Sequence, residues 1–81
     1  MFKEGLERIN GRNIVWTVRC EGQEGKSNGL DGGRIRTLAV WDDDFGDYYE
    51  EAFFQDGKWW KEAGKDKEIE AVVRKLIRKY N

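Results

Sequence analysis

The sequence contains no histidine, no proline and only one cysteine. Without histidine the chain lacks the commonest general base and transition-metal ligand, and the single Cys20 cannot form an internal disulfide or a thiolate metal cluster. Zinc sites and histidine-based catalytic triads are therefore excluded. Because we find no other pairing of a nucleophile with a base, we expect a binding protein without a catalytic residue, metal or cofactor.

Long apolar runs are also missing from the chain. No stretch approaches the roughly 18 apolar residues that a membrane-spanning helix needs, and residues 1–5 do not provide the apolar run of a signal peptide. We therefore expect a soluble, cytoplasmic protein that does not associate with a membrane.

Eighty-one residues suffice for one domain, and a chain this short buries only about 60–65% of its unfolded surface. Aromatic residues make up 14% of the chain and apolar residues 38%, which is typical of a folded protein. We expect residues 1–81 to form a single domain with a compact core.

The dipeptide Asn10-Gly11 interrupts a strand-like stretch near the N-terminus. It accepts the positive φ angles of a two-residue turn, so it predicts a hairpin between residues 2–9 and residues 13–21. The second strand alternates, and we expect one of its faces to enter the core. That face consists of Ile14, Trp16, Val18 and Cys20.

Residues 21–33 contain five of the ten glycines and predict a surface loop. A strand rich in β-branched and aromatic residues follows over residues 34–41, and we expect it to lie at the centre of the sheet with both faces partly covered. Strict alternation places Ile35, Thr37, Ala39 and Trp41 on one face and Arg34, Arg36, Leu38 and Val40 on the other.

The dipeptide Asp56-Gly57 is a second hairpin signal, between residues 48–55 and residues 58–62. An acidic turn over residues 42–47 precedes it. The first strand of this hairpin mixes aromatic and acidic residues on both faces, so its residue pattern does not identify which face points inward. The second strand shows one tryptophan to each face.

From residue 66 to residue 80 the apolar period changes from two to 3.6, which predicts an amphipathic helix with Asp66 as its N-cap. Its apolar stripe needs a sheet face to cover it. The sequence therefore predicts an α+β fold: an approximately five-stranded, mostly antiparallel meander with one C-terminal helix packed on one face. The stripe consists of Ile69, Val72, Val73, Leu76, Ile77 and Tyr80.

Three motifs resemble a family of small uncharacterised bacteriophage and prophage proteins. They are SNGLDGGRI at residues 27–35, the DGKW turn at residues 56–59, and KYN at residues 79–81. The family's usual turn carries an arginine that is absent here. The resemblance covers most of the chain and implies a phage-type accessory protein in a bacterial host cell, for which binding and blocking a host factor is a common role.

Charge is unevenly distributed, with seven carboxylates and no basic residue in residues 42–57. Acidic groups interleaved with aromatic ones are suited to occupy the basic groove of a nucleic-acid-handling protein. We therefore expect a non-catalytic protein that docks on a host or phage protein, such as a defence factor, in the manner of an anti-CRISPR inhibitor. The expected contacts are Asp42, Asp43, Asp44, Phe45, Asp47, Tyr48, Tyr49 and Glu51. A solvated acidic surface is the simpler alternative.

Arg19, Arg34 and Arg36 provide a second hypothesis, because neighbouring strands can bring them to one face near aromatic side chains. Such a face suits single-stranded nucleic acid, with the arginines contacting phosphates and the aromatic rings stacking on bases. The alternative is that these arginines pair with nearby carboxylates across the sheet. A homodimer, in which exposed aromatic residues of two copies pack together, is a further alternative.

Overall fold

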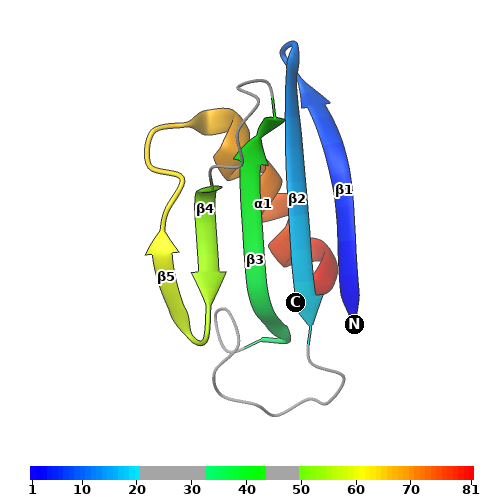
Figure 1. Ribbon diagram of the computed structural model, residues 1–81, viewed down its shortest axis with the longest axis vertical. Coiled ribbons are helices and arrows are strands. Elements are labelled where there is room, and N and C mark those ends of the chain that lie inside the picture. Colours follow the sequence, from blue (N-terminus) through cyan, green and yellow to red (C-terminus); the bar gives the residue numbers. More distant parts are fainter. Residues whose placement is uncertain (21–32, 44–49) are drawn as a thin grey trace.

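The computed structural model describes residues 1–20, 33–43 and 50–81. They form two layers, an antiparallel sheet and one helix that lies across a single face of it (Figure 1). The strands lie in chain order and are β1 (Phe2–Ile9), β2 (Arg12–Cys20), β3 (Ile35–Asp42), β4 (Glu50–Gln55) and β5 (Lys58–Lys61). The helix is α1 (Lys67–Tyr80). The predicted α+β meander with a C-terminal helix is confirmed.

Both predicted hairpin turns are present. Asn10 and Gly11 have φ angles of 51° and 80°, and Asp56 and Gly57 have φ angles of 52° and 80°. Two successive positive φ angles define the type I′ turn, whose twist matches that of the flanking strands. These turns join β1 to β2 and β4 to β5, and they set the register of both hairpins.

The helix begins as predicted, because the Asp66 side chain accepts a hydrogen bond of 3.2 Å from the backbone N–H of Ile69. Acidic residues occupy its first turn and basic residues its last, which matches the helix dipole. Its buried residues are Ile69, Val72, Val73 and Leu76. Burying a large apolar side chain of this kind contributes about 1.5–3 kcal/mol.

The predicted inward face of β2 is confirmed, since Ile14, Trp16, Val18 and Cys20 are all buried in one cluster with the helix stripe. On β4, Ala52 and Phe54 join the same cluster. This observation settles the inward face of that strand, while residues 48 and 49 of the predicted strand lie outside the described part.

The predicted alternation of β3 is wrong at its first residues. Arg19 pairs with Thr37 while Cys20 pairs with Ile35, so Arg36 is an extra residue in a β-bulge. The bulge brings the fully buried Ile35 to the face that Leu38 and Val40 share, against the helix. A bulge depends on pairing between strands, which strict alternation along one strand does not reveal.

Gly5 of β1 allows the indole of Trp16 to lie against the strand backbone. A Cβ atom at this glycine would lie 2.5 Å from Cζ2 of Trp16, closer than side-chain atoms approach in proteins. Trp16 is 8% exposed and belongs to the core. The absence of a side chain at Gly5 is therefore a packing requirement.

We expect Gly5→Ala to lower the free energy of unfolding by about 1–3 kcal/mol, because the new methyl group overpacks the Trp16 ring. In an open strand the same change stabilises, since alanine has less backbone entropy to lose. Urea denaturation measures the difference, with Glu4→Ala at the neighbouring exposed position as the control. A Gly5→Ala protein more stable than the wild type would contradict this packing.

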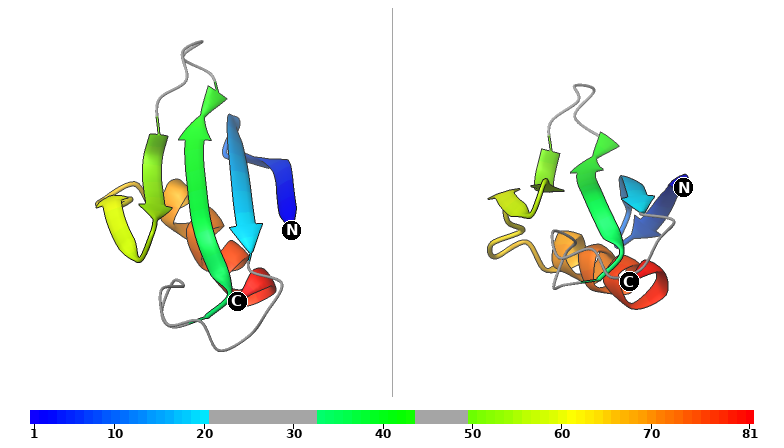
Figure 2. Two further views of the ribbon diagram at one scale, coloured as in Figure 1. Left: turned by 60° about the horizontal axis from the view of Figure 1, so that its bottom comes forward. Right: turned by 90° about the horizontal axis from the view of Figure 1, so that it is seen from below.

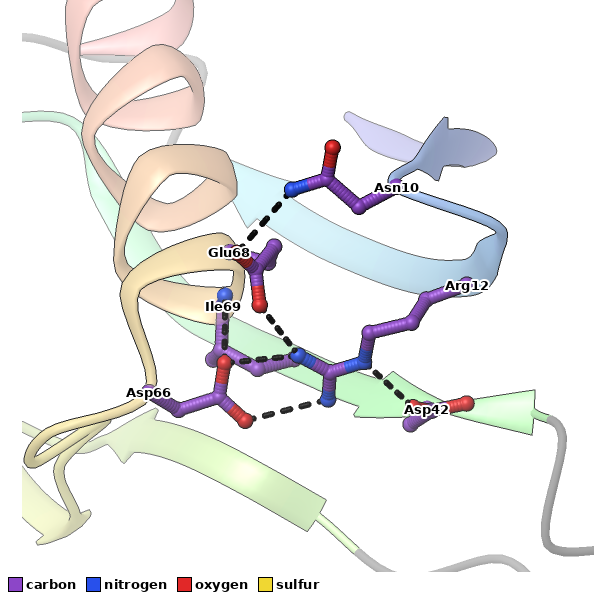
Figure 3. A network of polar contacts seen from close by, with 6 residues as sticks. All are labelled: Asn10, Arg12, Asp42, Asp66, Glu68 and Ile69. Atoms are coloured by element: carbon purple, nitrogen blue, oxygen red, sulfur yellow. Dashed lines mark hydrogen bonds and ion pairs between the residues drawn. The ribbon is translucent and has the colours of Figure 1, made fainter.

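Arg12, the first residue of β2, joins three elements through its guanidinium (Figure 3). Its Nε donates to Asp42 at 2.7 Å, and Nη1 and Nη2 donate to the two carboxylate oxygens of Asp66 at 2.8 and 3.0 Å. Nη1 also donates to Glu68 at 3.0 Å. Glu68 in turn accepts a hydrogen bond from the Asn10 amide at 3.2 Å.

This network ties the start of the helix to the end of β3 and to the β1–β2 hairpin. The Asp42 side chain is only 3% exposed, and the ion pair with Arg12 compensates its charge. The same bonds, that to Asp66 foremost, raise the pKa of the Arg12 guanidinium above its ordinary value. Arg12 therefore stays charged at any pH at which the protein is folded.

We expect Arg12→Ala to lower the free energy of unfolding by about 3 kcal/mol, because it leaves the buried Asp42 carboxylate without its cation. Arg12→Lys should recover only part of this, since one ammonium group cannot reproduce the planar guanidinium fork. Arg8→Ala, at an exposed position of β1, serves as the control and should change the free energy by about 0.5 kcal/mol or less. Equal losses for Arg12→Ala and Arg8→Ala would show that the network is not structural.

The hydrogen bonds from Arg12 lower the pKa of Asp66 below its ordinary value of 3.8. A lowered pKa in the folded state means that ionised Asp66 stabilises the fold above pH 3.8, and that this stabilisation is lost as the pH falls through the folded-state pKa. We expect the free energy of unfolding to fall less steeply below about pH 4 in Asp66→Asn than in the wild type. Urea denaturation at a series of acidic pH values measures both slopes, and parallel slopes would contradict the assignment.

Candidate functional site

The helix covers only one face of the sheet, and among the described residues no helix lies on the opposite face, here called the open face (Figure 2). Alternation along the strands places a second set of side chains on this face, many of them apolar or aromatic. Phe2, Leu6 and Trp60 are 60%, 57% and 59% exposed. Phe2 and Leu6 lie on β1 and Trp60 lies on β5, so large apolar groups are exposed at both edges of this face. A contiguous exposed apolar patch marks an interaction site.

One row across the open face is apolar. Leu6 of β1 pairs with Val15 of β2, which pairs with Trp41 of β3. Val15 and Trp41 are half-buried beside the exposed Leu6. We call these three residues the apolar row. It lies toward the end of the sheet at which β3 ends and β4 begins.

A second row, toward the opposite end of the sheet, is polar and basic from β2 to β5, with the exposed Phe2 of β1 paired to its Arg19. Arg19 pairs with Thr37, Thr37 with Gln55, and Gln55 with Lys58. The bulge adds Arg36, and a hollow of about 330 Å³ lies between Arg19, Cys20, Arg36, Thr37, Gln55 and Asp56. We call Arg19, Arg36 and Lys58 the basic end of the open face.

The acidic segment predicted to bind a partner is only partly described. Asp42 is 4% exposed and bound to Arg12, so its predicted role as a partner contact is corrected to a structural one. Asp43 is exposed directly after it, and Glu51 on β4 is half-buried. The remaining predicted contacts, Asp44, Phe45, Asp47, Tyr48 and Tyr49, lie outside the described residues.

Two of the three predicted arginines come together. Arg19 and Arg36 line the same hollow, although they lie on different strands, because the bulge changes the direction of Arg36. Arg34 is exposed just before β3 and is not among the residues that line this hollow. Burial raises the pKa of the Cys20 thiol. The positive charge of Arg34 lies close enough to lower that pKa and so opposes the effect of burial.

Gly33 and Ile35 meet the C-terminal residue Asn81 in space. The Asn81 side chain accepts a hydrogen bond of 3.0 Å from the backbone N–H of Ile35. A Cβ atom at Gly33 would lie 2.3 Å from the Asn81 carboxamide, so the glycine makes room for it. In the described residues, this part of the GGRI and KYN motifs holds the end of the helix against the start of β3, and its role is structural.

A larger hollow of about 470 Å³ lies on the helix side, between α1 and the segment that follows β5. Arg74 at its rim is bound to Glu70 at 2.8 Å. Because these charges already pair with each other, we place no ligand there. Within the ranges that the structure describes, no group of three or more carboxylate or cysteine side chains is placed to hold a metal ion. No helix among them is long and apolar enough to cross a bilayer.

Comparisons with protein-family models, with curated proteins and with solved structures gave no match.

The sequence analysis did not identify the apolar row. A usable signal was present, since the outward parity of β2 contains Val15 beside Thr17 and Arg19. An apolar residue such as Val15 on the outward face of an internal strand indicates a sheet face that another surface partly covers. The prediction of one tryptophan to each face is confirmed, because Trp59 packs in an edge-to-face contact on Phe54 while Trp60 is exposed.

Proposed function

We propose that this protein is a non-catalytic binding protein that docks on another protein through the apolar row and the adjacent acidic segment. The observation that carries the proposal is the open face, on which Leu6 is 57% exposed beside Val15 and Trp41. In residues 1–20, 33–43 and 50–81 a helix covers the other face, and the open face is the sheet surface that this part of the chain presents to a partner.

An apolar centre with a charged rim is the usual composition of a protein interface. Here the row ends at Trp41, and the acidic run of the sequence begins at Asp42 and reaches β4 at Glu50. The exposed Asp43 is the described part of that rim. A partner with an apolar patch beside basic groups would complement this surface, because opposite potentials meet across an interface.

The resemblance to phage proteins supports a partner from the host or the phage. A partner that handles nucleic acid fits the acidic segment, because nucleic-acid-handling proteins have basic grooves. The acidic rim then occupies the groove and the apolar row anchors it. Under this proposal the protein acts as an inhibitor by occupying the groove and performs no chemistry.

We expect Leu6→Ala and Val15→Ala to weaken capture of a specific partner at least tenfold, because they remove apolar area at the centre of the interface. Lysine substitutions at Asp43, Asp44 and Asp47 should slow association and reverse its salt dependence. The measurement is capture from nuclease-treated bacterial lysate by the tagged wild-type protein, then surface plasmon resonance with the purified partner and each variant.

Ala71→Ser on the exposed side of α1 is the matched control and should leave the partner affinity unchanged. Light scattering of the protein alone belongs to the same experiment. A stable dimer that Leu6→Ala dissociates would assign the apolar row to a second copy of the chain and contradict docking on another protein. A partner whose affinity is the same for wild type, Leu6→Ala and the lysine variants would contradict it as well.

A further inference from the structure

The basic end of the open face is separate from the apolar row and has a different chemistry. Arg19 and Arg36 line one hollow together with the Thr37 hydroxyl and the Gln55 amide. Among the described residues that line it, Asp56 carries the one carboxylate. Two guanidinium groups beside a hydroxyl and an amide outnumber this carboxylate and form a setting for a phosphate, which arginine binds through paired hydrogen bonds.

An exposed aromatic ring lies beside this hollow on the next strand. Trp60 is 59% exposed, and its indole N–H donates to the backbone carbonyl of Gln55 at 3.2 Å, which fixes the ring near β4. The Lys58 ammonium lies 4.2 Å from the centre of the Trp60 ring. One face of the ring therefore carries a cation that can also meet a phosphate.

The arginines and the tryptophan lie on different strands of the same face. Arg36 on β3 and Trp60 on β5 are separated by β4 and lie on opposite sides of the row formed by Thr37, Gln55 and Lys58. Each nucleotide of a nucleic-acid chain carries a phosphate and a base. One such chain can therefore place a phosphate at the arginines and a base on the tryptophan.

We propose that the basic end of the open face binds single-stranded nucleic acid, with phosphates at Arg19 and Arg36 and a base stacked on Trp60. A single strand is favoured over a duplex because only an unpaired base can lay its face on an aromatic ring. A single strand is also favoured over an acidic protein, because the exposed Trp60 ring can stack on a base, whereas a carboxylate makes no stacking contact. This inference does not rest on the docking proposed above, which uses other residues.

The test is fluorescence anisotropy of a labelled oligothymidine of about 12 nucleotides, titrated with the full-length protein between about 50 and 200 mM salt. We expect Arg19→Ala combined with Arg36→Ala to weaken binding at least tenfold. The slope of log affinity against log salt should become shallower by about 1.4, because each phosphate contact to a single strand contributes about 0.7.

Trp60→Ala should weaken binding roughly fivefold to a hundredfold through the loss of stacking, and Trp60→Phe should restore most of it. Arg78→Ala, which removes an exposed positive charge from the last turn of α1, is the matched control and should change affinity by less than about twofold. Arg19 and Trp60 are exposed, so single substitutions at these residues should leave the fold intact. They still test the inference if the change at Arg36 disturbs the bulge.

Several results would overturn the inference. They are no binding of the oligonucleotide at low salt, an equal loss with Arg78→Ala and with the double arginine variant, or a duplex bound as tightly as the single strand. Competition by polyglutamate at the same charge concentration as the oligonucleotide would identify a surface for acidic proteins instead. Competition by inorganic phosphate together with no effect of Trp60→Ala would identify a site for free phosphate.

Discussion

The guanidinium of Arg12 bonds to three carboxylates that lie 30, 54 and 56 residues away in the sequence. Asp42 ends β3, while Asp66 caps the helix and Glu68 lies in its first turn. Because Asp42 is buried and negatively charged, the hairpin, the central strand and the helix start must come together for its charge to be compensated. The contact thus favours one placement of the helix. At the other end of α1, Asn81 holds the chain against the start of β3.

Holding the helix on one face leaves the other face open. The helix covers the buried cluster of β2, β3 and β4, and among the described residues no helix lies over the opposite parity of the same strands (Figure 2). That face is apolar toward the end where β3 meets the acidic segment and basic toward the end where the bulge inserts Arg36. Two different surfaces therefore share one sheet, and the substitutions that test them do not overlap.

Much of this architecture is predictable from the sequence, because its signals are local. Asn10-Gly11 and Asp56-Gly57 specify turns through their own φ angles, and the helix stripe and Asp66 cap lie within one segment. The bulge at Arg36 and the Arg12 network depend on strands and residues distant in sequence, which no local pattern reveals. The sequence analysis predicted that Arg19 and Arg36 share a face, and it also placed Asp42 on the surface. Its carboxylate is buried because of a partner 30 residues away.

The central claim is that the open face, and not the helix side, is the binding surface. The indole N–H signals of the tryptophans in a nitrogen-15 NMR spectrum test it directly, because Trp60 is exposed on the open face while Trp16 is buried beneath the helix. Titration with a short single-stranded oligonucleotide should shift the Trp60 signal and leave the Trp16 signal in place. A shift of the Trp16 signal and of the α1 amides, with Trp60 unchanged, would contradict the account.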